Sequence, residues 1–324
     1  MPSTLDLIGN RQRGAGFVNE QAMISLSQAK RTDRLMKATT SLTVAEFEAL
    51  AKDFAPLWDG LLAAQTAEGT PRRRQPGGGR KGALTTPELK LFFILFYYKA
   101  YPTQDLMGLL FGFTQGQVSD WVRRLTAAVG QLLPLHKPAR AARDVSALLA
   151  REPALQEVLI DGTERRLPRP THAGRQRRYY SGRKKRPTVK NVIVTAHGRV
   201  RWCSRTVPGR RHDKAVTEQE RLRLPKAVPV LADSGFAGLD PGAATLLTPW
   251  KKPKGRKLHW QRRAFNRLLA RERVRVEHTL ASVKRLRILR DEFRNRRKGM
   301  VDAVMAIGCT LHNYRWTCRQ GTTA

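Results

Sequence analysis

In the stretch Glu157-Val158-Leu159-Ile160-Asp161-Gly162-Thr163, three apolar residues precede one aspartate, and a glycine follows it directly. This pattern is typical of a buried strand that delivers Asp161 to the edge of a sheet. A second apolar run, Val228-Pro229-Val230-Leu231-Ala232, ends in the same way at Asp233-Ser234-Gly235. A third carboxylate, Glu277, lies inside a long helical pattern. We therefore expect these three acids to meet in space.

The charge of the chain indicates the kind of partner that such acids would meet. The 324 residues include 61 Lys and Arg against 26 Asp and Glu, which gives a formal net charge of +35. An excess of this size favours a polyanion, most simply nucleic acid, over a small-molecule substrate. A solvated basic surface and an anionic membrane are the alternatives. With 41% hydrophobic residues, the chain can form a real core of one or two domains.

The compartment can be predicted from the cysteines and from the longest apolar run. Cys203, Cys309 and Cys318 form no CxxC pair, which speaks against a disulfide framework or a zinc site. The run from Leu91 to Tyr98 is too short to span a bilayer, and the N-terminus has no signal-peptide core. We expect a cytoplasmic, nucleoid-associated protein with reduced thiols and no membrane partner.

The first half of the chain is predicted to be helical. Residues 1–40 are polar and weakly periodic, so we expect a poorly ordered extension. Residues 41–138 form the next predicted domain, with a helix from Thr43 and a basic, glycine-rich segment over 71–82. That segment is either a solvated linker or an arm that lies along phosphates; the sequence favours neither.

Residues 86–133 carry the pattern of a helix-turn-helix. Helical periodicity over 103–111 is followed by Gly112-Phe113-Thr114 and by a further helix from Gln115 to about Leu133. Four polar residues of this last helix are expected to face outward and contact DNA bases or phosphates. These residues are Gln115, Gln117, Ser119 and Arg123. An ordinary helical bundle without a role in base recognition is the alternative.

Residues 139–316 are predicted to form an α/β domain, followed by a tail over 317–324. After a connecting helix over 139–155 and the Asp161 strand comes a dense basic segment that includes Arg183, Lys184 and Lys185. These three residues are candidates for DNA contact, with a solvated face as the alternative. A hairpin, a helix from 213 to about Arg223, the Asp233 strand and a short strand at 245–248 follow. Helices over 260–289 and 300–316 complete the domain. This order predicts a ribonuclease H-like mixed sheet flanked by helices.

Three acids on rigid elements suit phosphoryl transfer. Mg²⁺ prefers carboxylate oxygens, and a pair of divalent ions can activate a nucleophile and stabilise the phosphate charge. Arg273 lies four residues before Glu277 and Lys284 seven residues after it, so the three share one helical face. Glu164 and Asp213 are rival ligands, and Asp213 could instead cap a helix. His212 and His278 lie beside acids, but we expect loop or helix-surface roles for both.

These residues resemble the DDE transposases of bacterial insertion sequences, specifically the insertion-sequence five group, over roughly residues 41–316. The motifs that carry the resemblance are Gly77-Gly78-Gly79-Arg80-Lys81, Tyr101-Pro102-Thr103-Gln104-Asp105-Leu106, Asp161-Gly162-Thr163-Glu164, Tyr179-Tyr180-Ser181-Gly182, Pro208-Gly209, His212-Asp213, Asp233-Ser234-Gly235-Phe236 and Val276-Glu277-His278. Arg273, Glu277 and Lys284 also hold the places of a signature in this group, whereas its tyrosine is replaced by Ala270.

The resemblance implies a ribonuclease H-like transposase with Asp161, Asp233 and Glu277 as catalytic ligands of two Mg²⁺ ions, for which Mn²⁺ can substitute. Arg273 and Lys284 would contact DNA. Such an enzyme binds the terminal inverted repeats of its element, frees a 3′-hydroxyl there and joins it to target DNA, working as a homo-oligomer on paired ends. A metal-dependent nuclease without strand transfer and a non-catalytic DNA-binding regulator remain as alternatives.

Overall fold

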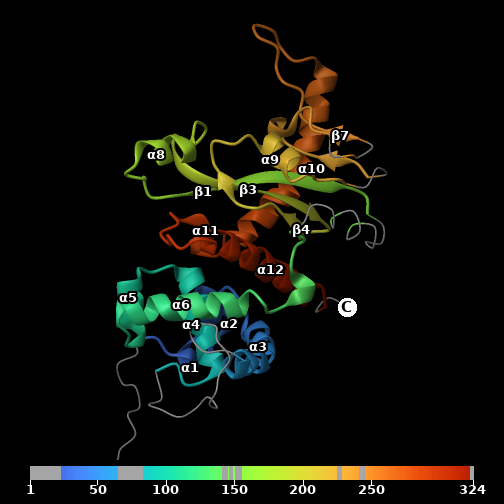
Figure 1. Ribbon diagram of the computed structural model, residues 1–324. Coiled ribbons are helices and arrows are strands. Elements are labelled where there is room, and N and C mark those ends of the chain that lie inside the picture. The colour runs from blue at the N-terminus through green and yellow to red at the C-terminus, as the bar shows by residue number, and fades with distance from the viewer. Residues whose placement is uncertain are drawn as a thin grey trace, which may run out of the picture.

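The structure is a computed structural model that describes residues 23–64, 83–140, 145, 149, 155–224, 228–240, 242 and 245–321. The helices of the first half gather on one side of the molecule and the sheet lies on the other (Figure 1). The C-terminal helix α12, Met300–Gly321, runs between them and touches both. The predicted linker over 71–82 and most of the predicted helix over 139–155 lie outside the described residues.

The described residues of the N-terminal part form six helices. They are α1 (Leu26–Ala29), α2 (Asp33–Thr40), α3 (Val44–Ala64), α4 (Pro87–Ala100), α5 (Gln104–Phe111) and α6 (Gln115–Val129). Side-chain caps define several of their starts, since Thr32, Thr86 and Thr103 each accept a backbone N–H from the first turn. Helix α4 is buried along most of its length and forms the centre of this group.

The predicted poor order of residues 1–40 is wrong for the described residues 23–40. Helices α1 and α2 form there because Thr32 caps α2 and Met36 buries its whole side chain in the core. The apolar residues of this segment are few, so the helical period is weak in the sequence, but tertiary packing still holds the helix.

Helices α5 and α6 meet at a tight turn. Gly112 ends α5 in the left-handed region with φ 71°, which favours glycine. Thr114 then starts α6 through a capping box with Gln117, in which each side chain bonds the backbone N–H of the other residue. Helix α6 ends at Val129 instead of the expected Leu133, and a short 3-10 turn, η1 (Pro134–His136), follows.

One mixed sheet forms the second half of the molecule. Its strands are β1 (Val158–Arg166), β2 (Tyr180–Ser181), β3 (Arg186–Ala196), β4 (Arg199–Cys203), β5 (Val207–Pro208), β6 (Val230–Leu231) and β7 (Leu246–Leu247). The order is β2-β3-β1-β6-β7, and β4 and β5 also pair with β3. Strand β1 runs antiparallel to β3 and parallel to β6, which runs parallel to β7. The expected hairpin and the short strand at 245–248 are therefore confirmed.

The remaining helices cover the sheet. They are α8 (Ala173–Tyr179), α9 (Asp213–Gln219), α10 (Trp260–Val283), α11 (Arg287–Arg290), α12 and the 3-10 turn η2 (Ser234–Phe236). The single helix predicted over 260–289 is wrong, because α10 ends at Val283 and α11 begins only at Arg287. Helix α9 ends at Gln219, short of the expected Arg223, and α12 extends past the predicted end at residue 316.

Two hydrophobic clusters lie on the two faces of the sheet. Leu159 belongs to the first, and its neighbours Val158 and Ile160 belong to the second, as the alternation of a strand requires. The first cluster continues from the sheet through α10 and α12 into helices α2 to α6. The boundary predicted at residue 138 therefore falls within one continuous core.

Candidate active site

Asp161 lies on β1 and faces the same side of the sheet as Leu159, toward α10. Its side chain is 16% exposed, and its Oδ1 accepts the Gly162 N–H at 2.9 Å. The Arg273 Nη2 of α10 lies 3.8 Å from the same oxygen. Burial raises the pKa of Asp161 to about 6; the Gly162 N–H and Arg273 oppose this rise, and the charges of Asp233 and Asp213 add to it. A proton or another cation is therefore favoured at this carboxylate.

Asp233 follows β6, the parallel neighbour of β1. Because Leu159 pairs with Leu231, Asp161 and Asp233 each stand two residues beyond paired positions, at the same end of adjacent strands. The Asp233 Oδ1 accepts the Gly235 N–H at 2.8 Å and so starts the turn η2. The two predicted strand-end aspartates thus lie close enough for the charge of Asp233 to raise the pKa of Asp161.

Asp213 is the third acid near this pair. It is the first residue of α9, and a Cβ placed on Gly162 would lie 2.5 Å from its Oδ1. Only a glycine at position 162 therefore leaves room for the Asp213 carboxylate. The expected cap role is not what the geometry shows: His212 is the N-cap residue and makes no side-chain cap bond.

Lys190 is a buried cation in this site that the sequence did not identify. Its Nζ lies 3.0 Å from Asp213 Oδ1 and 3.5 Å from Glu164 Oε1, and it donates to the Arg211 carbonyl at 2.9 Å. Glu164 and Lys190 face each other across the β1–β3 ladder. Opposite charges on two strands could have suggested this pair, had the register been known.

The place of Glu277 beside the two aspartates remains a prediction. Glu277 lies exposed on α10, one turn beyond Arg273, and among the described residues no hydrogen bond or ion pair joins it to Asp161 or Asp233. Lys284, the C-cap of α10, is mostly buried, which lowers its pKa, while the charges of Asp161 and Glu164 raise it. Among the described residues, no three His, Cys, Asp or Glu side chains are grouped to hold a metal ion.

A cavity of about 500 Å³ opens beside these acids. Its lining combines Glu164, Asp213 and Asp233 with Lys190, Arg183, Arg210 and Arg211. Of the three basic residues expected to contact DNA between β2 and β3, only Arg183 lines it, while Lys184 and Lys185 are exposed beside it. His212 lies exposed at the rim, and His278 lies exposed on α10. The cavity thus presents carboxylates together with basic side chains. A bound phosphodiester requires the basic side chains, and its cations require the carboxylates.

The α6 residues expected to contact DNA already have partners within the protein. Gln117 Oε1 accepts the Thr114 N–H in the capping box, and the Gln115 side chain bonds Gln104. Arg123 pairs with Asp120 at 3.6 Å, and Ser119 is half-buried. Their role in DNA binding remains a prediction.

Comparisons with known proteins show what the chain is similar to. Residues 160–313, which contain Asp161, Asp233 and Glu277, match the family described as DDE superfamily endonuclease. The chain is also 26% identical over 230 residues to a probable transposase for insertion sequence element IS702 from Microchaete diplosiphon, which covers 70% of this chain and 79% of that protein. No solved structure matches the chain.

The domain match supports a DNA endonuclease of the DDE type, a class that uses divalent metal. Among the described helices, none is long and apolar enough to cross a membrane.

Proposed function

We propose that this chain is a transposase that binds the terminal inverted repeats of its mobile element, cleaves DNA there and joins the 3′-hydroxyl ends to target DNA. The observation that carries this proposal is the convergence of Asp161 and Asp233 at one end of adjacent parallel strands. The sheet order, with an antiparallel triplet β4-β3-β1 followed by β6 and β7, is the order that a ribonuclease H-like domain requires. We also propose that the chain belongs to the insertion-sequence five group of transposases.

The two aspartates fit a divalent metal. Both offer hard oxygen donors of the kind that Mg²⁺ or Mn²⁺ prefers, and burial together with the charge of Asp233 raises the pKa of Asp161, so a bound cation would stabilise its charged form. We propose Asp161, Asp233 and Glu277 as the ligands of two Mg²⁺ ions. When bound, such ions activate a water or hydroxyl nucleophile and stabilise charge on the phosphate.

Other side chains of the site would bind and orient the DNA. Arg273 and Lys284 of α10 lie on the Asp161 side of the sheet, where their charges can contact phosphates beside the scissile bond. Lys190 holds Asp213 and Glu164 in place at the wall of the cavity. The proposed partners are double-stranded DNA and further copies of the chain on paired DNA ends. The proposed location is the cytoplasm, at the nucleoid.

The test uses a labelled duplex that carries one end of the element, with Mg²⁺ and the purified chain. Asp161→Asn, Asp233→Asn and Glu277→Gln are each expected to abolish cleavage and leave DNA binding in EDTA unchanged. Glu272→Gln is the matched control, because this exposed residue lies on the same helix and pairs with Arg275. Cleavage retained by Asp161→Asn would overturn the proposal and favour a non-catalytic regulator.

Two further measurements refine the test. Joining of pre-cut ends to a plasmid separates a transposase from a nuclease that lacks strand transfer. Binding of Mn²⁺, followed by electron paramagnetic resonance, separates the two candidate third ligands: loss of an ion in Glu277→Gln supports Glu277, whereas loss in Asp213→Asn alone would assign that place to Asp213.

A further inference from the structure

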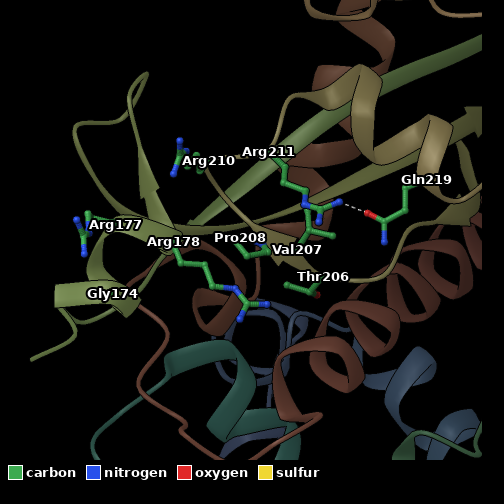
Figure 2. A pocket seen from close by; sticks show the side chains of 9 residues that line it. All are labelled: Gly174, Arg177, Arg178, Thr206, Val207, Pro208, Arg210, Arg211 and Gln219. Carbon is green, nitrogen blue, oxygen red and sulfur yellow. Dashed lines mark hydrogen bonds between the residues drawn. The ribbon is translucent and has the colours of Figure 1, made fainter. Parts of the chain in front are cut away.

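The cavity of about 500 Å³ that Glu164, Asp213 and Asp233 line is called the acidic cavity here. A second cavity, of about 790 Å³, lies beside it and is lined by four arginines. Arg177 and Arg178 come from α8, and Arg210 and Arg211 come from the loop between β5 and α9. Figure 2 shows the four side chains around the hollow. Arg211 bonds the Gln219 side chain; within the described residues, no carboxylate pairs with Arg177, Arg178 or Arg210. The cavity thus carries the positive charges of three arginines that no carboxylate of the described residues pairs with.

This arginine cavity shares lining residues with the acidic cavity and with a third hollow. Arg210 and Arg211 also line the acidic cavity. Arg210 and Arg177 line a further hollow of about 490 Å³ together with Tyr180, a residue that is 43% exposed. Arg210 is thus common to all three hollows. A chain of phosphates that leaves the acidic cavity would meet arginines on its way and an aromatic ring beside them.

We infer that the arginine cavity and Tyr180 bind an unpaired DNA strand next to the scissile phosphate. Arginine guanidinium groups bind phosphate oxygens through paired hydrogen bonds. An exposed tyrosine ring among them can stack on a base, and only an unpaired strand offers a free base face, since a duplex keeps its bases stacked inside. The inference rests on the proposed function, in which the scissile phosphate lies at Asp161 and Asp233, and Asp233 lines the acidic cavity.

The experiment measures binding of the full chain without metal, so that it does not depend on cleavage. The probes are a fluorescein-labelled single strand of about 20 nucleotides, a length chosen to exceed the site size of one domain, and the blunt duplex of the same sequence. The first variant is Arg177→Ala/Arg178→Ala/Arg210→Ala. The matched control, Arg31→Ala/Arg34→Ala/Lys52→Ala, removes three exposed charges from the helices α1 to α3 and their connections.

The cavity variant is expected to lower the affinity for the single strand about tenfold or more, and to make the slope of log affinity against log salt shallower by about 2, because three phosphate contacts are lost. The control should leave both quantities unchanged. Equal behaviour of the two triple variants would overturn the inference. An equal loss for single strand and duplex would also overturn it, since that result describes a duplex surface.

Tyr180 supplies an independent arm. Tyr180→Leu is expected to weaken single-strand binding about tenfold, whereas Tyr180→Phe, which keeps the ring, should bind like the unaltered chain. Leu and Phe variants of equal affinity would remove the stacking role and overturn the inference. Because cleavage by the unaltered chain is measured separately with Mg²⁺, failure of the proposed function and failure of this inference are distinguishable.

Discussion

The Asp161 carboxyl is surrounded by groups that shift its proton affinity in opposite directions. Burial raises its pKa to about 6, and the Gly162 N–H and Arg273 only partly oppose this. A carboxyl whose pKa is higher in the folded chain than in the unfolded chain stabilises the fold only below the unfolded pKa, near 4. That stabilisation is lost as the pH rises through about 6, so the charged form at neutral pH costs stability.

Asp161→Asn is therefore expected to stabilise the metal-free protein. At pH 7.5 the free energy of unfolding in urea with EDTA should rise by about 2–3 kcal/mol, and the gain should shrink to about half of that at pH 5. Asp240→Asn, at an exposed carboxylate of the loop after η2, is the control and should change little. A gain of equal size at both pH values would show that ionisation of Asp161 is not its cause.

The site could be predicted from the sequence only in part. Two apolar runs that each end in an aspartate were enough to place Asp161 and Asp233, because a buried strand leaves its carboxyl-terminal side chain at the sheet edge. The third acid could not be placed in this way. Which side of α10 faces β1 depends on how the helix packs, and the packing presents Arg273 to Asp161. Lys190 was missed because its partner is fixed by strand register.

At the scale of elements, the α5–α6 turn depends on Gly108 as well as on Gly112. A Cβ on Gly108 would lie 2.4 Å from the Phe113 carbonyl oxygen, closer than real Cβ contacts come. That carbonyl is fixed, because the Phe113 N–H bonds the Gly108 carbonyl at 2.8 Å. The close approach of the two helices therefore requires a residue without a side chain at this position.

Gly108→Ala is expected to lower the free energy of unfolding by about 1–3 kcal/mol, as overpacking of a fixed contact does. Gly116→Ala on α6 is the matched control, since a Cβ there meets no atom within 4 Å and should add up to about 1 kcal/mol through helix propensity. Urea unfolding followed by circular dichroism measures both. A stable Gly108→Ala variant would mean that the turn can open without loss.

His312 of α12 ties three elements together as a neutral ring. Its Nδ1 bonds Ser282 Oγ of α10 at 2.9 Å, and its Nε2 bonds the Gly198 carbonyl of the β3–β4 turn at 2.8 Å. Burial lowers the pKa of His312 to about 4, and nearby arginines lower it further. Because the folded pKa is depressed, the unfolded chain takes up a proton first, and stability is lost as the pH falls from about 6.5 toward 4.

His312→Gln should therefore make the free energy of unfolding depend less on pH between 7.5 and 5. The loss of unfolding free energy between pH 7.5 and pH 5 is expected to be about 2 kcal/mol smaller in the variant than in the unaltered chain. The variant will also be less stable at pH 7.5, because it loses the ring. His278→Gln, at an exposed position of α10, should leave the pH dependence as it is. The same dependence in all three proteins would assign it to other groups.

The elements themselves were largely predictable, but the break between α10 and α11 was not. The alternating pattern of residues 188–206 fixed the hairpin, since His197 and Gly198 both adopt positive φ at its turn. The continuous helical period through Lys284 gave no sign that the chain would break between Val283 and Arg287. Leu286, Ile288 and Leu289 are buried in the core, and α12 and α4 pack against this corner, so tertiary contacts decide the break.

On the scale of the whole molecule, one hydrophobic cluster joins the N-terminal helices to one face of the sheet. Polar contacts cross the same junction: the Tyr314 hydroxyl donates to the Glu46 carbonyl at 2.7 Å, and Arg315 donates to Ser41 Oγ at 2.9 Å. Neither half could separate without exposing apolar surface that the other half now covers.

Thermal unfolding is therefore expected to occur in one cooperative transition, with calorimetric and van't Hoff enthalpies equal. Differential scanning calorimetry of the full chain in EDTA measures both. Tyr314→Phe removes one of the crossing hydrogen bonds and should lower stability by about 1 kcal/mol without splitting the transition. Two resolved transitions would show that the helical half and the sheet fold independently.

The shared hydrophobic cluster also fixes the distance between the N-terminal helices and the acids of the sheet. Helix α6 and the Asp161 end of β1 belong to one packed body, so the distance between them is set by side-chain packing and cannot be adjusted by a hinge. If α6 contacts DNA as predicted, a DNA end held at both places would be cut at a constant number of base pairs from the sequence that α6 contacts. An inverted repeat lengthened or shortened between these two points would still bind, but its scissile phosphate would lie away from Asp161 and Asp233.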